Sequence, residues 1–270
     1  MQRDCDDLEN ALLAAAKISA AAALPVRTPG IAEAYAIQRR VNASTNMPVM
    51  LWKLGLTGAG VRETFGASEP TVGRLPASAI CSDRSEIPFV GAEMFAEAEL
   101  VFQMGSDLPL QSRPYTREDI CAALKGIYGG IEIVRTRFVT SDLTLPLLIA
   151  DNSMAHGLVL GRNLSSHWDN RFVEMPVTLV RSDGQAIDGS TAHVMGNPLD
   201  AVVWLANWLR EHEGYALRRE QLIASGTCTG ATEIFANDVI RASFDGAEAA
   251  RVSVRAPEQK EQRQCVCNWG

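Results

Sequence analysis

Two glutamates separated by one alanine, Glu97 and Glu99, stand in the otherwise apolar segment MFAEAELVFQMG. Residues two apart on a strand point to the same face, so these carboxylates are predicted to lie close together. Like charges at that spacing repel each other, and a buried carboxylate without a partner is costly. Three arrangements relieve this: a divalent metal binds both, a basic residue bridges them, or an edge strand leaves both in water.

Two further charged residues stand alone inside apolar segments. Glu132 interrupts GGIEIVRTRF, and Lys53 interrupts LWKLGLTG. Either one alone is typical of a structural salt bridge. Together with Glu97 and Glu99 they give three acids and one base on predicted strands. Because hard cations prefer oxygen ligands, three carboxylates without a Cys–His cluster favour Mg²⁺ or Mn²⁺ over zinc. Lys53 can balance the negative charge that three carboxylates and a dication leave over.

The helices that help to position these residues are predicted from apolar spacing and capping signals. Asn197 is expected to cap the last of them, Pro198 to open it and Gly214 to stop it. Thr116 and Asp119 can form a capping box before the preceding one. The predicted helices span residues 7–24, 30–44, 117–129 and 198–213.

Strands are predicted to dominate from about residue 78 onward, where short apolar runs alternate with turn formers. Residues 62–75 are rich in turn formers and are expected to form a loop. Asn237 is expected to adopt a left-handed turn conformation. The predicted strands lie at 94–105, 129–138, the second half of 149–161, both sides of the turn SDGQ, 221–228, 239–244 and 251–256.

These elements predict an α+β fold. The expected parts are a helical N-terminal lobe at 1–77, a β-rich catalytic domain at 78–256 and a flexible tail at 257–270.

Composition excludes several classes of partner. The chain has 270 residues, a net charge of −7 and no basic run, which argues against nucleic acid or an anionic membrane surface. No apolar run approaches the ~18 residues of a membrane span, and the charged N-terminus does not resemble a secretory signal. The six scattered cysteines are typical of reduced thiols in a cytoplasm. The Cys265–Cys267 pair is either a soft-metal or redox site or, as we expect, a loose tail with two incidental thiols.

Eight segments, in this order along the chain, resemble the 2-keto-4-pentenoate hydratase and 4-oxalocrotonate decarboxylase family of the fumarylacetoacetate hydrolase superfamily. The resemblance extends from about residue 10 to 255. The segments are AYAIQ (34–38), WKLGLT (52–57), EPTVGRL (69–75), AEAEL (96–100), GIEIVRTRF (130–138), IADNSMAHGLVLG (149–161), GNPLDAVVWLANWL (196–209) and SGTCTGATEIFANDVIRASF (225–244).

The resemblance implies a main domain of the fumarylacetoacetate hydrolase type and a metal-dependent lyase. It places Mg²⁺ or Mn²⁺ on Glu97, Glu99 and Glu132, and makes Lys53 the active-site lysine. The implied reaction is hydration of a 2-hydroxy-2,4-dienoate to a 4-hydroxy-2-oxo acid in aromatic-compound catabolism. A homo-oligomer is implied as well. Lys53 either transfers a proton, for which burial beside a metal would depress its pKa, or only neutralises the glutamates.

Four residues are candidates for binding the substrate. Ser225 and Thr227 lie in a hydroxyl-rich turn and can bind a carboxylate, although ordinary turn chemistry explains them equally. Asp151 matches the family segment but also suits a turn cap. Arg137 is either an anion contact or a member of a surface ion pair.

Three different functions compete with hydration. A decarboxylase of the 4-oxalocrotonate type would use the same metal but a substrate with a second carboxylate. An acylpyruvate C–C hydrolase would need a His–Glu pair to activate water, and none is evident among the histidines at 156, 167, 193 and 212. A non-catalytic partner in a mixed complex would not need to keep the three glutamates and the lysine.

Overall fold

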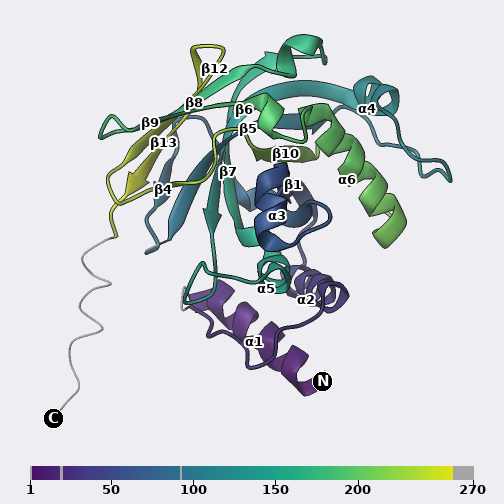
Figure 1. Ribbon diagram of the computed structural model, residues 1–270, viewed down its shortest axis with the longest axis vertical. Coiled ribbons are helices and arrows are strands. Elements are labelled where there is room, and N and C mark those ends of the chain that lie inside the picture. The colour runs from purple at the N-terminus through teal and green to yellow at the C-terminus, as the bar shows by residue number, and fades with distance from the viewer. Residues whose placement is uncertain (1, 19–20, 92, 258–270) are drawn as a thin grey trace.

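The computed structural model describes residues 2–18, 21–91 and 93–257 (Figure 1). The Cys265–Cys267 pair and nearly all of the predicted tail lie outside these ranges. Within them, no helix combines the length and the apolar character that a membrane crossing requires.

The helices follow their capping signals closely. Asn197 Oδ1 accepts the Leu199 amide at 3.0 Å, and Gly214 ends the same helix in the left-handed conformation. The capping box of Thr116 and Asp119 also forms as predicted. The α-helices are α1 (Gln2–Ile18), α2 (Ile31–Ala43), α3 (Ala59–Phe65), α4 (Arg117–Ala123), α5 (Leu145–Ala150) and α6 (Pro198–Glu213). Short 3₁₀ turns lie at Ala77–Ala79, Asn152–Met154, Asn170–Phe172 and Thr191–His193.

The strands form a large mixed sheet and a smaller one. The large sheet runs β2-β1-β10-β5-β6-β7-β3, with β11 paired to β5, and the small sheet runs β4-β13-β12-β8-β9. The strands of the large sheet are β1 (Val49–Gly55), β2 (Thr71–Pro76), β3 (Ile80–Ser82), β5 (Met94–Met104), β6 (Leu124–Arg135), β7 (Ala155–Ser165), β10 (Leu222–Thr227) and β11 (Thr232–Glu233). Those of the small sheet are β4 (Glu86–Pro88), β8 (Pro176–Arg181), β9 (Ala186–Ser190), β12 (Val239–Phe244) and β13 (Ala247–Arg255).

The helices gather around the large sheet. In Figure 1, α1, α2 and α5 lie together at the bottom, α6 lies along the right side, and β8, β9 and β12 lie toward the top left. This arrangement confirms the predicted α+β class.

The two faces of the large sheet carry different side chains. On β1, Trp52 and Leu54 pack into the main core, whereas Leu51 joins a small second cluster. Lys53 shares the face of Leu51, because strand side chains alternate. Glu97 and Glu99 lie on this second face as well, since they are four and two positions before Val101 on the same strand. The second cluster consists of Leu51, Val101, Leu158, Leu222 and Ala224.

Four predicted elements are corrected. Residues 62–75 are not a loop, since they contain the end of α3 and all but the last residue of β2, which pairs with β1 along its length. The helix predicted at 117–129 ends at Ala123, and the following strand begins at Leu124 rather than at residue 129. Gly129 lies within that strand where the two sheets approach, and a Cβ there would lie 2.7 Å from Ala249 Cβ.

The first helix ends at Ile18, well before Pro25.

The turns were predicted more accurately. SDGQ closes the β8–β9 hairpin, with Arg181 N donating to Gln185 O at 2.8 Å. Asn237 has a φ of 70°. The domain boundary after residue 77 stays a prediction. The strands β1 and β2, which precede it, pair within the same sheet as β10 and β5.

Candidate active site

The pairing of β5 with β6 brings the three glutamates together. The strands are antiparallel, and Glu97 lies directly opposite Glu132. Opposed residues share a sheet face, as do Glu97 and Glu99 two positions apart. One carboxylate oxygen from each of the three lies within 4.8 Å of the others. The predicted cluster therefore forms.

The cluster lies inside the protein. Strand β5 lies between β10 and β6, and Glu99 and Glu132 are both 0% exposed. Of the three arrangements considered for Glu97 and Glu99, the solvated edge strand is therefore excluded.

Several of these carboxylate oxygens lack hydrogen-bond partners. Glu99 Oε2 accepts the Gly226 amide at 2.9 Å. Glu99 Oε1 and both oxygens of Glu132 are buried without a partner. Buried anionic oxygens left this way are costly unless a cation accompanies them. The cluster offers only oxygen ligands, which fits a hard divalent cation.

The pKa shifts of the three glutamates also favour a bound divalent cation. Burial raises the pKa of Glu97, although the Lys53 ammonium opposes it, and burial raises the pKa of Glu132 well above its usual range. Burial, followed by repulsion from Glu97, raises the pKa of Glu99 to about 8. A divalent cation would relieve the same repulsion that protons relieve.

Lys53 reaches the cluster from β1. Its Nζ lies 3.6 Å from Glu132 Oε2 and donates to the Ser153 carbonyl oxygen at 2.9 Å. Burial lowers the pKa of Lys53, but the glutamates, led by Glu132, outweigh burial and the net shift is upward. This upward shift applies with no cation bound, because three carboxylates then act on one ammonium. The depressed pKa expected for Lys53 beside a metal stays a prediction.

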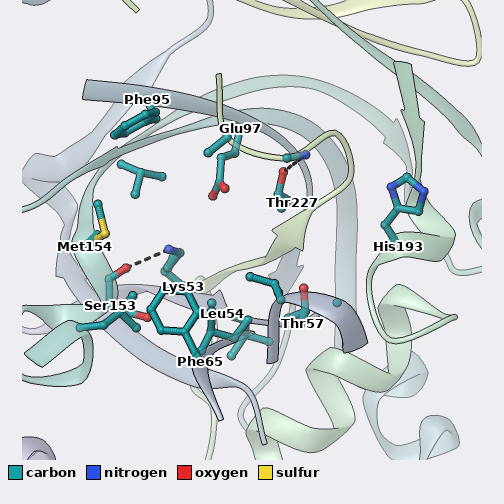
Figure 2. Close-up of a pocket in the computed structure, with 18 of the residues that line it drawn as sticks. Lys53, Leu54, Thr57, Phe65, Phe95, Glu97, Ser153, Met154, His193 and Thr227 are labelled. Carbon is teal, nitrogen blue, oxygen red and sulfur yellow. Dashed lines mark hydrogen bonds between the residues drawn. The ribbon is translucent and has the colours of Figure 1, made fainter. Parts of the chain in front are cut away.

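A cavity of about 500 Å³ opens onto Lys53 and Glu97. Figure 2 shows these two side chains directed into the same space, with Phe95 and Phe65 on opposite sides of it. Such a cavity suits a small, partly apolar acid whose polar end lies beside Lys53 and Glu97. Its apolar wall consists of Leu54, Leu56, Val61, Phe65, Phe95, Val134, Leu148 and Met154.

The four predicted substrate-binding residues lie in different surroundings. Thr227 lines the cavity, and its Oγ1 accepts the Gly230 amide at 2.8 Å. Ser225 is 0% exposed and donates to the Leu100 carbonyl oxygen at 2.9 Å. The buried Asp151 accepts Arg137 Nε at 2.6 Å, so these two residues pair with each other. Of the four, only Thr227 borders the cavity, and their roles stay predictions.

Two cavity residues were missed from the sequence. Ser153 supplies the carbonyl that receives Lys53. His193 lines the wall, and its Nδ1 lies 2.8 Å from the Cys228 carbonyl oxygen. Because a carbonyl only accepts, Nδ1 carries the proton in this contact. No local signal identifies His193, since the chain reaches the cavity there only through tertiary packing.

Comparisons with known proteins agree with this geometry. A 2-keto-4-pentenoate hydratase of Paraburkholderia xenovorans is 29% identical over 225 residues, 81% of this chain and 82% of that protein. A 2-hydroxyhexa-2,4-dienoate hydratase of Comamonas testosteroni is 28% identical over 194 residues, 70% of this chain and 71% of that protein. A 4-oxalocrotonate decarboxylase of a Pseudomonas species is 27% identical over 184 residues, 67% of this chain and 69% of that protein.

The chain is a homologue of these hydratases and decarboxylases. No protein-family model matches it. Among solved structures, the 4-oxalocrotonate decarboxylase from Pseudomonas putida G7, complexed with magnesium and adipate, superposes with a TM-score of 0.82. That match covers 94% of this chain and 98% of the decarboxylase at 20% identity, and it shows a shared fold. A fumarylacetoacetate hydrolase family protein from Yersinia pestis, at 13% identity over 77% of this chain and 94% of that one, gives a TM-score of 0.57. The predicted superfamily fold is confirmed.

Proposed function

We propose that the protein is a lyase that hydrates a 2-hydroxy-2,4-dienoate of the 2-oxo-4-pentenoate type to a 4-hydroxy-2-oxo acid. The observation that carries this proposal is a cluster of three carboxylates beside Lys53, at one end of a largely apolar cavity. Glu99 and Glu132 are buried with oxygens that lack hydrogen bonds, and the half-buried Glu97 faces the cavity. The curated hydratases among its homologues support the same reaction class. Breakdown of aromatic compounds is the setting that the resemblance implies.

Glu97, Glu99 and Glu132 would hold Mg²⁺ or Mn²⁺. When bound, the metal supplies a Lewis acid that stabilises negative charge developing on the 2-oxo acid end of the substrate. The magnesium in the decarboxylase of similar fold supports a divalent ion here. The Gly226 amide fixes the orientation of the Glu99 carboxylate.

The protein's own groups would handle the proton and the diene. Hydration adds hydroxyl to C4 and hydrogen to C3 and C5, while the 2-hydroxyl group loses its proton. Lys53 Nζ is the candidate to donate a proton or to hold the developing oxyanion. The apolar wall would bind the diene carbons and limit access of bulk water to them.

Of the four predicted substrate-binding residues, only Thr227 keeps that role in this proposal. Thr227 would bind the substrate carboxylate, because it lines the cavity, whereas the buried Ser225 would support the neighbouring strand through the Leu100 carbonyl. Asp151 and Arg137 would support the site through their mutual ion pair.

A direct assay tests the proposed reaction. Purified protein with Mg²⁺ should consume 2-hydroxypenta-2,4-dienoate, seen as loss of dienoate absorbance, and should form 4-hydroxy-2-oxopentanoate. A chelator should stop the reaction. If neither this dienoate nor its 5-methyl homologue is hydrated with Mg²⁺ or Mn²⁺, the proposal is wrong.

His193 favours a second candidate function, decarboxylation of the 4-oxalocrotonate type. It lines the cavity, and a histidine side chain is a suitable neighbour for the second carboxylate that such a substrate carries. Release of CO₂ from 2-oxohex-3-enedioate, without hydration of monoacid dienoates, would select this function.

An acylpyruvate hydrolase and a non-catalytic partner have less support. The hydrolase needs a His–Glu pair, and His193 Nδ1 contacts the Cys228 carbonyl instead. A non-catalytic partner is disfavoured by the convergence of Lys53 with three acids, although co-purification with a related chain would favour it.

We also propose a homo-oligomer and a cytoplasmic location. Exposed sheet edges give the oligomer modest physical support. Sedimentation showing only a 29.2 kDa species at micromolar concentration would contradict it.

A further inference from the structure

The turn between α5 and β7 has an unusual backbone. Asn152, Ser153 and Met154 are consecutive left-handed residues, with φ angles of 57°, 58° and 57°. This conformation is unfavourable for residues with a Cβ and persists only where the surroundings enforce it. The turn also borders the cavity, because Ser153 and Met154 line it.

The side chain of Asn152 supplies the enforcing contacts. Its Oδ1 accepts the Arg74 amide at 3.0 Å, and its Nδ2 donates to the Arg74 carbonyl oxygen at 2.9 Å. The amide group therefore pairs with both backbone groups of a β2 residue, as a neighbouring strand would. Asn42 Nδ2 donates to the same Oδ1 at 3.0 Å, and Asn152 is 2% exposed.

Strand β2 holds the turn from its other side. A Cβ at Gly73 would lie 2.5 Å from the Asn152 carbonyl oxygen, so the turn packs directly on the strand backbone. The hydroxyls of Thr71 and Ser153 are 2.5 Å apart. These contacts fix the direction of the peptide groups within the turn.

The fixed turn determines where Lys53 lies. The Ser153 carbonyl oxygen receives Lys53 Nζ at 2.9 Å, whereas Glu132 Oε2 is 3.6 Å away. Rotation of Ser153 out of the left-handed region would turn its carbonyl away from Lys53. The ammonium would then move toward the carboxylates, which attract it.

We propose that Asn152 is a positioning residue for Lys53. By holding the left-handed turn on β2, Asn152 keeps the Ser153 carbonyl on Lys53 and the ammonium directed toward the cavity. This inference rests on the proposed function, in which Lys53 acts on the substrate.

The test uses Asn152→Ala and Asn152→Gly in the full chain. Glycine removes the side chain but tolerates the left-handed backbone. The Asn152→Gly variant can therefore fold even if Asn152→Ala does not. Asn207→Ala is the matched control: the Asn207 amide pairs with both backbone groups of Tyr115, at 2.8 and 3.0 Å, and lies on α6 outside the cavity lining. Both Asn152 variants should lose kcat on the order of 10- to 100-fold with little change in KM. The control should retain kcat.

A double-mutant cycle with Lys53→Met separates positioning from general destabilisation. If Asn152 acts through Lys53, Asn152→Ala should cause little further loss in the Lys53→Met background. A structural role would instead lower turnover by the same factor in both backgrounds.

A second readout does not depend on activity. The ¹⁵Nζ resonance of Lys53, assigned by its loss in Lys53→Met, should shift in Asn152→Ala and stay in place in Asn207→Ala. A shift in a protein that hydrates no dienoate would reject the proposed function but retain the positioning role. An unmoved resonance, additive losses in the cycle, or failure of both Asn152 variants to fold would overturn the inference.

Discussion

Lys53 Nζ is hydrogen-bonded to the Ser153 carbonyl oxygen at 2.9 Å, while the Oε2 carboxylate oxygen of Glu132 lies 3.6 Å away. The lysine is thus held by a neutral backbone group beside three acids. Its charge stabilises the carboxylates, and the 3.6 Å ion pair leaves Glu132 Oε2 without a hydrogen bond from Nζ. This arrangement leaves that oxygen able to bind a cation and leaves the ammonium able to face a substrate.

Replacing a proposed metal ligand should abolish function without unfolding the protein. Glu97→Gln removes one anionic oxygen, so metal affinity and turnover should fall on the order of 100-fold or more. Titration with Mg²⁺ would measure the loss of metal affinity, and thermal unfolding would show whether the fold is retained. Glu174→Gln is the control, since Glu174 is exposed and outside the cavity lining, and it should change neither. Normal turnover by Glu97→Gln after chelator treatment and metal return would place the site elsewhere.

Lys53→Met distinguishes proton transfer from charge balance. If Lys53 transfers a proton, kcat should fall greatly while metal affinity and oxalate binding stay nearly constant. If it only balances charge, metal should bind more tightly, because no ammonium competes, and kcat should fall modestly. Lys125→Met is the control, since Lys125 pairs with the exposed Glu220. Tighter metal binding with nearly normal kcat would exclude the proton-transfer role.

Metal affinity should depend on pH because of Glu99. With no cation bound, burial and repulsion from Glu97 raise the pKa of Glu99 to about 8 from an ordinary 4.5. Between these values the folded state holds a proton that the unfolded chain releases, so stability in chelator should fall as pH rises. Over the same interval Mg²⁺ should bind more tightly as pH rises, because binding displaces the proton. Calorimetric titrations across this interval would measure the trend, and Glu99→Gln should weaken it.

The two neighbouring hydroxyls, Ser225 and Thr227, should have separable effects. Ser225→Ala removes a buried bond to the Leu100 carbonyl, which should cost about 1 kcal/mol of unfolding free energy. Thr227→Val removes a hydroxyl that lines the cavity and accepts the Gly230 amide, so it should raise KM, whereas Ser225→Ala should leave KM nearly unchanged. Denaturant unfolding and steady-state kinetics on both variants would test this. Equal effects on KM would show that the distinction drawn from burial is wrong.

The cap of α6 should contribute measurably to stability. Asn197→Ala removes the acceptor of the Leu199 amide, and should cost about 1 kcal/mol. Asn197→Asp keeps an acceptor and should restore most of the loss. Denaturant unfolding would measure both variants, and turnover per folded molecule should not change in either.

The sequence alone determined the local parts of this protein. Glu97 and Glu99 share a face because strand alternation depends only on their spacing. The cap at Asn197, the stop at Gly214 and the SDGQ turn likewise follow from preferences within a few residues. The ordered family segments also indicated the metal and Lys53 roles, which stay proposals.

Only the tertiary structure decided which distant groups meet. The register of β5 on β6 puts Glu132 opposite Glu97, and the position of β5 between two strands excludes a solvated edge. Pairing with β1 makes a strand of residues expected to form a loop, and packing on β2 turns the Ser153 carbonyl toward Lys53. Such outcomes depend on contacts between distant segments, as with Lys53 and Ser153, which are 100 residues apart. No local pattern specifies the burial and register of such contacts. His193 was missed for the same reason.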